Sequence, residues 1–337
     1  MSMSKKKMSD MESYPPVLRR LISETEDNPE EAPVLNRDKD IPIPVIDLEC
    51  LDAELLRGAC RDWGIFRLQN HGIPLTVTSR LQGISKALLS LPFETKQLMT
   101  SPVSYFWGTP ALTPSGSALG RGTADVINLV EGFNVPLSHL RDDAHRQHQH
   151  PLLEPFRELM DEYGRHLSRV AETLFEAILR NLNLDIKRSE YLSEATGLVR
   201  VYRYPGISGE ALGMEVHTDS SVLSILSQDQ VGGLEFIKDG EWFHVQPLPN
   251  TLIVNLGDMM QAISNDEYRS VEHRVGMRKG RERQSICYFV FPEKDRVIES
   301  SRYKPFTYSQ FQAQVQLDLH SLGSKVGLPR FLASPPS

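Results

Sequence analysis

Short apolar segments with a two-residue period dominate the chain after Gly197, and they predict a β-rich C-terminal half. The dipeptides Gly232-Gly233, Asp239-Gly240 and Pro249-Asn250 separate several of these segments with residues that favour turns. Many short strands at this spacing indicate a β-sandwich or barrel, which we interpret as a jelly roll. The expected strands cover residues 198–204, 222–227, 234–237, 242–246, 251–255 and 284–291.

The N-terminal half has mainly helical periodicity. Apolar residues recur every three or four positions in residues 76–90 and, over the longest stretch, in residues 152–183. Shorter helices are expected at 53–62, after Leu91-Pro92 and at 308–321, whereas IPIPVIDL and GIFRLQN resemble extended segments. The overall prediction is mainly β, with a helix-rich N-terminal region laid on the jelly-roll core.

These patterns divide the chain into four parts. Residues 1–40 are polar, charged and dotted with proline, so we expect a mobile arm in which a short helix near Leu18–Leu21 docks. A helix-rich region follows at 41–196, then the β core at 197–300, then a C-terminal helix and tail at 301–337.

Composition narrows the classes of protein that remain. The net charge of −7 argues against a nucleic-acid partner, and no apolar run is long enough for a membrane span. Three cysteines in 337 residues do not build a disulfide framework. The start of the chain lacks a secretory signal, so we expect a cytoplasmic protein, with the nucleus not excluded. The oligomeric state cannot be read from the sequence.

The segment EVHTDSS contains the first candidate metal ligands, His217 and Asp219. Residues two positions apart point to the same side of a strand, so both side chains can reach one cation. His273, in SVEHRVG, is the best candidate for a third ligand. Two imidazoles and one carboxylate suit non-haem Fe(II), although the same set also binds zinc. The other histidine cluster, at His145, His148 and His150, is expected to be solvated surface.

Ten residues after His273, Arg283 and Ser285 again share one face of an expected strand. A guanidinium binds a carboxylate through two parallel hydrogen bonds, and a hydroxyl can donate a third. The pair therefore fits the distal carboxylate of a small diacid. The alternative is that Arg283 begins an edge strand and points to water, as its basic neighbours in KGRERQ do.

Several motifs together closely resemble the soluble 2-oxoglutarate-dependent dioxygenases of plants. They are HTDSSVLSILSQDQVGGLEF, VNLGDMMQAISNDEYRSVEHRV and RQSICYFVFP, preceded by IPVIDL, WGIFRLQNHGIP and LPFETKQ. The similarity runs from about Ile41 to Phe331. Within the family the chain is most similar to gibberellin oxidases and gibberellin-oxidase-like members.

The resemblance implies a double-stranded β-helix core with Fe(II) held by His217, Asp219 and His273. It also implies that Arg283 and Ser285 bind the distal carboxylate of 2-oxoglutarate, with O2 as second cosubstrate and ascorbate as a stimulant. The family usually has Asn-x-Tyr-Pro before the core, and the run here is YRYP. Tyr204 matches the tyrosine that helps to bind 2-oxoglutarate, whereas a tyrosine at position 202 replaces the asparagine.

The expected activity is therefore oxygenation, most simply hydroxylation, of a small and largely apolar plant metabolite, with a gibberellin-type diterpenoid favoured. Auxin, jasmonate, flavonoids and alkaloids are alternative substrates. A hormone-binding protein without turnover and a zinc hydrolase are alternative classes. Asp258 and Asn70-His71-Gly72 are expected to be structural. The expected pocket-wall residues are Phe106, Trp107, Phe133, Leu223 and Phe291, with Tyr105 to Trp107 in a loop over the site.

Overall fold

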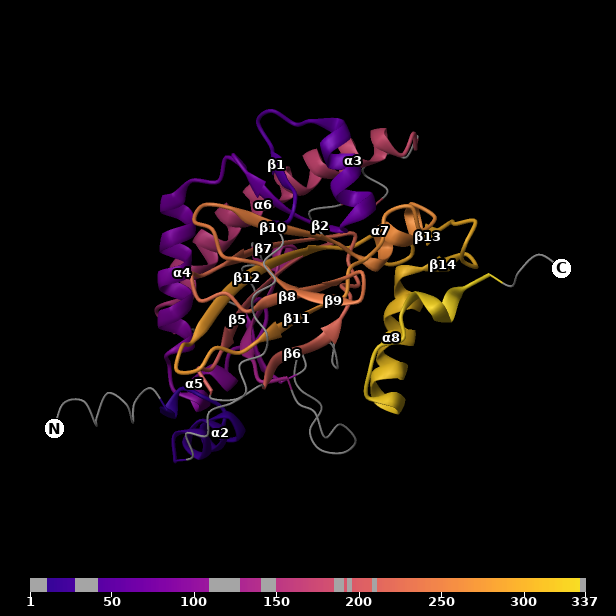
Figure 1. The fold of residues 1–337 in the computed structure, drawn as a ribbon. Coiled ribbons are helices and arrows are strands. Elements are labelled where there is room, and N and C mark those ends of the chain that lie inside the picture. The colour runs from indigo at the N-terminus through magenta and orange to yellow at the C-terminus, as the bar shows by residue number, and fades with distance from the viewer. Residues whose placement is uncertain are drawn as a thin grey trace.

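Two β-sheets face each other at the centre of the molecule, and helices flank them on both sides (Figure 1). The computed structural model describes residues 11–27, 42–108, 128–140, 150–184, 191–192, 196–207 and 211–333. Within these residues the two facing sheets agree with the jelly roll that the strand spacing predicts. No helix among them is long and apolar enough to cross a membrane.

The larger sheet has the order β1-β2-β10-β7-β12-β5-β4-β3, and its neighbours are antiparallel except for β1 and β2. Its strands are β1 (Val45–Asp47), β2 (Ile65–Gln69), β3 (Ser104–Trp107), β4 (Glu131–Pro136), β5 (Gly197–Tyr204), β7 (Leu223–Gln228), β10 (Leu252–Leu256) and β12 (Arg283–Val290). Its central strands are almost wholly buried, as a sheet covered on both faces requires.

The smaller sheet has the order β6-β11-β8-β9. Its strands are β6 (Leu212–His217), β8 (Leu234–Lys238), β9 (Glu241–His244) and β11 (His273–Gly276). A short hairpin of β13 (Val297–Ile298) and β14 (Phe306–Thr307) lies before the last long helix. The six strands predicted in the C-terminal half are confirmed as β5, β7, β8, β9, β10 and β12, within one or two residues at most ends.

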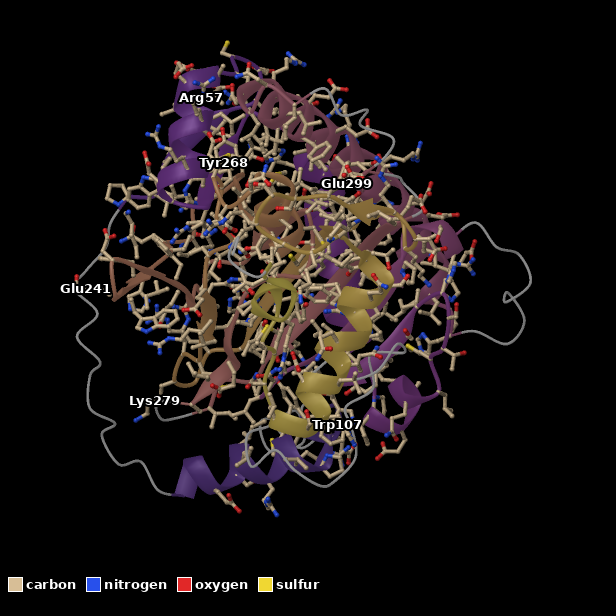
Figure 2. The ribbon with its side chains drawn as sticks, turned by 90° about the vertical axis from the view of Figure 1, so that its right-hand side faces the viewer. Arg57, Trp107, Glu241, Tyr268, Lys279 and Glu299 are labelled. Carbon is tan, nitrogen blue, oxygen red and sulfur yellow. The ribbon has the colours of Figure 1, made fainter. Side chains whose placement is uncertain are left out.

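Helices cover the larger sheet on one side and close the end of the barrel on the other. The helices are α2 (Pro16–Asp27), α3 (Ala53–Asp62), α4 (Leu75–Leu89), α5 (Phe93–Gln97), α6 (Leu153–Asn181), α7 (Asp258–Ile263) and α8 (Tyr308–Leu322), with 3-10 turns at Leu137–His139 and Leu328–Phe331. The apolar stripe of α6 packs against α4 and the sheet. In both views α8 lies on the opposite side, across the front of the sheets in Figure 2.

The two faces of strand β12 are buried in two different apolar clusters. Ile286, Tyr288 and Val290 point into the main core beneath α6, and Cys287 and Phe289 point between the two sheets. This alternation was predicted from the two-residue period. The strand lies between β5 and β7, so Arg283 at its start is not on a sheet edge.

One part of the predicted arm, residues 11–24, is docked on the rest of the molecule. Ser13, Tyr14 and Leu18 are buried, and the predicted docking helix extends over Pro16–Asp27. The segment docks because its few apolar side chains and Tyr14 meet partners that lie far away in the sequence. Residues 1–10 and 28–40 lie outside the described residues, as do His145 and His148.

Candidate active site

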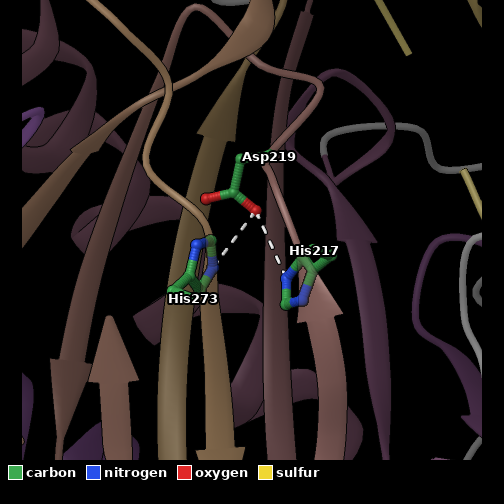
Figure 3. A group of neighbouring side chains, drawn as sticks. All are labelled: His217, Asp219 and His273. Atoms are coloured by element: carbon green, nitrogen blue, oxygen red, sulfur yellow. Dashed lines mark ion pairs between the residues drawn. The ribbon is translucent and has the colours of Figure 1, made fainter. Parts of the chain in front are cut away.

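His217, Asp219 and His273 meet at the end of the smaller sheet (Figure 3). His217 ends β6 and His273 begins β11, and the two are register partners across the antiparallel pair. The Nε2 atoms of both histidines lie 3.8 Å from Oδ1 of Asp219. Ligand atoms of all three residues lie within 4.8 Å of one another, near the ~3–4 Å expected around one cation with bonds of about 2.1 Å.

Both imidazoles are held with one nitrogen turned toward the shared point. Nδ1 of His217 lies 2.7 Å from the carbonyl oxygen of Glu215, and Nδ1 of His273 lies 3.1 Å from that of Val271. A carbonyl oxygen only accepts, so each Nδ1 donates its proton there, and Nε2 is the ring nitrogen that remains to bind a metal. Burial, together with the neighbouring His273, lowers the pKa of His217 to about 3, so its ring is neutral near pH 7.

Asp219 stays ionised despite being buried. Burial alone would raise its pKa, but the two histidines and a hydrogen bond from Ser224 hold the pKa below its ordinary value. Its backbone is fixed as well, because the N–H of Asp258 donates to the carbonyl oxygen of Asp219 at 2.8 Å. Two imidazole nitrogens and one ionised carboxylate are donors that bind a divalent cation, so the donor set fits a metal.

Arg283 lies in the same pocket, buried on β12 with its exposed fraction at 3%. Nη1 donates to Oγ of Ser285 at 3.0 Å, Nη2 donates to Oε1 of Gln228 at 3.1 Å, and the guanidinium stacks 4.9 Å from the Tyr204 ring centroid. Within the described parts of the chain, no carboxylate pairs with it. The alternative in which Arg283 points to water from an edge strand is therefore excluded.

The end of the pocket around Arg283 offers donors without acceptors. Nε of Arg283 and Nε2 of Gln228 are buried and have no hydrogen-bond partner among the described residues. Burial raises the pKa of Tyr204 to about 12, so its hydroxyl remains protonated and can donate. A buried charge is costly unless it is paired. The group that fits this end is therefore an anion with several acceptor oxygens, such as a carboxylate.

A glycine lets Tyr204 take its place in this cluster. Tyr204 and Arg283 are register partners on β5 and β12, and strand β6 passes over the tyrosine ring at Gly213. A Cβ at Gly213 would lie 2.5 Å from Cδ1 of Tyr204, closer than two carbon atoms can approach. A side chain at this position would therefore push the ring away from Arg283.

One cavity of about 760 Å³ joins the histidine–aspartate group to Arg283 and opens toward α8. Small-molecule sites span roughly 300–1,000 Å³, so the cavity has room for a small diacid and a second molecule. Phe289, Phe291 and Tyr308 form an aromatic wall, with Phe291 stacked 5.2 Å from Tyr308. The predicted role of Phe291 as a pocket-wall residue is consistent with this arrangement.

The other predicted aromatic and aliphatic wall residues lie elsewhere. Phe133 and Leu223 belong to the main core, Phe106 packs edge-on against Tyr202, and Trp107 does not line the cavity. Residues 104–107 form strand β3 and not a loop over the site, and they pair with β4. The loop prediction relied on the surrounding Gly, Pro and Ser residues, which do not reveal the pairing partner.

The C-terminal segment completes the site, which the sequence did not reveal. Nζ of Lys325 donates to the carbonyl oxygen of Thr218 at 2.6 Å and to Oγ of Ser220 at 3.2 Å. It also forms an ion pair with Asp258 at 2.7 Å. Asp258 thus has the structural role that was expected of it, but its partner is Lys325 and not the local turn. Lysine near a chain end is usually solvated, so no sequence pattern marked Lys325.

Arg200 is a second residue that sequence reasoning missed. It lies on β5, lines the cavity and is half-buried. Its Nε donates to Oδ1 of Asn134 at 2.7 Å, its guanidinium lies 5.5 Å from the Phe289 ring centroid, and Tyr202 is hydrogen-bonded to it. The alternation of GLVRVYRY places Arg200 on the same face as Tyr202 and Tyr204, which is the signal that could have identified it.

Two facing sheets that hold a histidine–aspartate–histidine group and a buried guanidinium define a non-haem metal oxygenase of the 2-oxoglutarate-dependent class. Two family models match the chain: the 2OG-Fe(II) oxygenase superfamily over residues 195–292, and the N-terminal region of non-haem dioxygenases, described for morphine synthesis, over residues 43–155. The chain belongs to the 2OG-Fe(II) oxygenase superfamily and is a dioxygenase whose cofactors are Fe(II) and 2-oxoglutarate.

Known relatives include gibberellin oxidases. Gibberellin 2-beta-dioxygenase 8 of Arabidopsis thaliana is 36% identical, with 87% of this chain and 88% of the relative covered. Gibberellin 2-beta-dioxygenase 6 of Oryza sativa subsp. japonica is 34% identical, with 88% and 86% covered. The predicted resemblance to plant dioxygenases and gibberellin oxidases is confirmed.

Two solved structures share the fold. The rice dioxygenase for auxin oxidation superimposes with a TM-score of 0.68 at 28% identity, covering 86% of this chain and all of that chain. JOX2, solved with 2-oxoglutarate, iron and JA, gives a TM-score of 0.69 at 25% identity, covering 88% and 90%. The predicted jelly-roll core is thereby confirmed.

Proposed function

We propose that this dioxygenase hydroxylates a small, largely apolar plant metabolite that carries a carboxylate, with a gibberellin-type diterpenoid as the favoured substrate. The observation that carries the proposal is one cavity that joins two histidines and a carboxylate to a buried guanidinium, for which the described residues offer no carboxylate partner. The 34–36% identity to two gibberellin dioxygenases supports the substrate class.

We assign the iron to His217, Asp219 and His273. The two Nε2 atoms and the ionised carboxylate support this assignment, since both nitrogens lie 3.8 Å from the same oxygen of Asp219. We assign the distal carboxylate of 2-oxoglutarate to Arg283, Ser285 and Tyr204. The unpartnered Nε of Arg283 and the protonated Tyr204 hydroxyl support this role, because an ionised carboxylate accepts hydrogen bonds from both.

Bound Fe(II) supplies the oxidising chemistry, in which 2-oxoglutarate and O2 give succinate and CO2 while one oxygen atom enters a C–H bond of the substrate. The protein residues position the reactants. Arg283 binds and orients the diacid from the closed end of the cavity. The aromatic wall of Phe289, Phe291 and Tyr308 holds an apolar skeleton and excludes water from the reacting centre.

Arg200 supports the proposal that the substrate carries a carboxylate. It lies in the cavity apart from Arg283, and no carboxylate among the described residues forms an ion pair with it. The family usually has an asparagine at position 202, and the Tyr202 present here packs beside Arg200 and Tyr204. A carboxylate on an otherwise apolar substrate would pair with Arg200 while its skeleton lies along the aromatic wall.

Replacing Arg200 by methionine is expected to raise the KM for an acidic substrate about 10- to 100-fold, the cost of one charge-assisted hydrogen bond. The KM for the methyl ester of the same substrate should change little, because the ester presents no charge. Steady-state kinetics with acid and ester would measure both. Arg180→Met, on the exposed face of α6, is the matched control. Equal losses for acid and ester would contradict the assignment.

Replacing Lys325 by methionine is expected to weaken metal binding about tenfold, because groups that hold the ligand-bearing loop typically contribute that much. The substitution removes both hydrogen bonds to the 218–220 loop and leaves Asp258 without its partner. Calorimetric titration of the metal-free protein with Mn(II) would measure the affinity. Lys325→Arg should restore most of it, whereas unchanged affinity in Lys325→Met would exclude this positioning role.

The substrate proposal is tested by incubating the protein with Fe(II), 2-oxoglutarate, O2 and ascorbate and a panel of gibberellins, auxin, jasmonate and flavonoids. Mass spectrometry should show a gain of one oxygen, matched by succinate formed. Oxygenation of another compound of the panel, and not of a gibberellin, would show that the substrate belongs to that compound's class. Tight binding without succinate would support a hormone-binding protein. Turnover without O2 would support a hydrolase.

The cysteines support the expected cytoplasmic location. Cys50, Cys60 and Cys287 are free, and Cys60 and Cys287 are buried at positions where no disulfide forms. Three cysteines with no disulfide between them are typical of a protein in a reducing compartment. Separation of cell extracts into cytosolic, nuclear and membrane fractions, followed by detection of the protein, would test this location.

A further inference from the structure

The N-terminal segment, residues 11–24, contacts two residues that lie next to Arg283, the proposed 2-oxoglutarate anchor, and its register partner Tyr204. The hydroxyl of Tyr14 donates to Oε2 of Glu282 at 2.5 Å, across 268 positions in the sequence. The Tyr14 ring packs 3.9 Å from the guanidinium carbon of Arg203, and Nη2 of Arg203 donates to Oγ of Ser13 at 3.0 Å. Tyr14 is only 6% exposed, so these contacts are enclosed.

Both residues that the segment holds come directly before a proposed cosubstrate ligand. Arg203 precedes Tyr204 on β5, and Glu282 precedes Arg283 on β12. Tyr204 and Arg283 are register partners, so the two strand ends meet at this point. Because side chains alternate along a strand, Arg203 lies on the face of the sheet away from the cavity. Tyr14 therefore contacts the strand ends on the face opposite to the cavity.

Arg203 is fixed on its other side by a buried carboxylate. Glu131 on β4 is fully buried and bonds to Arg203, to the Tyr105 hydroxyl and, at 2.7 Å, to Nζ of Lys96. A buried charge with several partners is costly to rearrange. This side of Arg203 is rigid, whereas the residues that the structure describes on the opposite side are Ser13, Tyr14 and the partly exposed Glu282.

Helix α2 keeps Tyr14 in place. Nε of Arg19 donates to the carbonyl oxygen of Tyr14 at 2.6 Å, and Arg19 also forms an ion pair with Glu94 of α5 at 3.5 Å. Leu18 is 1% exposed beneath the helix. Figure 1 shows α2 beside α5, at the end of the molecule away from α3 and α7. The segment is therefore docked at two places: Tyr14 contacts the ends of β5 and β12, and Arg19 contacts α5.

We propose that the N-terminal segment positions the strand ends that bind 2-oxoglutarate, with Tyr14 as its positioning residue. The inference rests on the proposed role of Arg283 as the cosubstrate anchor. When Tyr14 is bonded to Glu282 and packed on Arg203, the ends of β5 and β12 are held from both faces, and Arg283 and Tyr204 keep their mutual geometry. Loosening the segment weakens cosubstrate binding without touching the metal ligands or the aromatic wall.

The test compares Tyr14→Phe, which removes only the hydroxyl, with Tyr14→Ala, which also removes the ring over Arg203. The cosubstrate KM should rise about threefold and tenfold, respectively, because Tyr14→Phe loses one hydrogen bond to the strand ends whereas Tyr14→Ala also loses the ring contact with Arg203. The KM for the organic substrate should stay unchanged. Calorimetry of cosubstrate binding to the Mn(II)-loaded protein without O2 should give the same ratios independently of turnover.

Tyr303→Phe is the matched control, because it also removes a tyrosine hydroxyl that donates to a carboxylate, that of Asp266, near α7 and away from the ends of β5 and β12. It should lower the melting temperature and leave cosubstrate affinity unchanged. If Tyr14→Ala lowers the melting temperature and also leaves that affinity unchanged, the segment is structural only. Arg283→Ala, measured in parallel, separates the positioning role of Tyr14 from the anchoring role of Arg283. If Arg283→Ala also binds 2-oxoglutarate normally, the proposed anchoring role is refuted together with the positioning role.

Discussion

Replacement of Asp219 by alanine is expected to abolish turnover, with a loss of at least about 10³-fold, because the proposed metal site loses its carboxylate ligand and the reaction depends on the metal. His217→Ala should have the same effect. Activity assays with saturating Fe(II) would measure the loss, and added metal would not restore it, because the coordination point itself is gone.

A stability measurement separates this effect from misfolding. A metal that binds only the folded protein raises its stability by about 2.7 kcal/mol at a hundredfold excess over Kd, so Mn(II) should raise the melting temperature of the wild type. The two variants should have melting temperatures near that of the metal-free wild type, and Mn(II) should not raise them. Glu267→Ala, a change of an exposed carboxylate, should keep both activity and the rise. Near-normal turnover in Asp219→Ala would refute the ligand assignment.

Replacement of Arg283 by alanine is expected to raise the KM for the cosubstrate 2-oxoglutarate by about 10²- to 10⁴-fold. Two charge-assisted hydrogen bonds are lost, each worth roughly 1.5–3 kcal/mol. Arg283→Lys should recover only part of the affinity, because an ammonium cannot donate two parallel hydrogen bonds to one carboxylate. Steady-state kinetics with varied 2-oxoglutarate would measure the change.

The proposed metal ligands provide the control for this variant. Mn(II) affinity should be unchanged in Arg283→Ala, since the guanidinium does not contact His217, Asp219 or His273 in the structure. Arg281→Ala removes an exposed arginine two positions earlier and should leave the cosubstrate KM unchanged. If Arg283→Ala and Arg281→Ala bind the cosubstrate equally well, the carboxylate of 2-oxoglutarate lies elsewhere.

The sequence predicted the elements whose own pattern decides their structure. The alternation in β12 and the long stripe in α6 are local signals, and both were placed correctly. Strand β4 (EGFNVP) was missed because it contains glycine and proline, and because its pairing with β3 and β5 is a tertiary effect. Gly132 is required there, since a Cβ would lie 1.9 Å from the carbonyl oxygen of Val201.

The candidate site divides in the same way. The pairs at positions 217 and 219 and at 283 and 285 are close in sequence, so their spacing marked them. Lys325 and Tyr14 act through partners about a hundred or more positions away, at Thr218 and Glu282. No local pattern records such contacts. The expected wall residues other than Phe291 were misplaced for a related reason: aromatic and aliphatic side chains fill the core and the cavity alike, and only the fold distinguishes the two.

The two candidate histidine ligands are directly opposite each other on β6 and β11. A slip of one position in that pairing would turn one ring to the other face of the sheet, where it could not reach the cation. Metal uptake thus reports on the alignment of two strands that are joined by more than fifty intervening residues. A chain that pairs them wrongly would remain metal-free, and an inactive folding product would be separable from the native protein by its metal content.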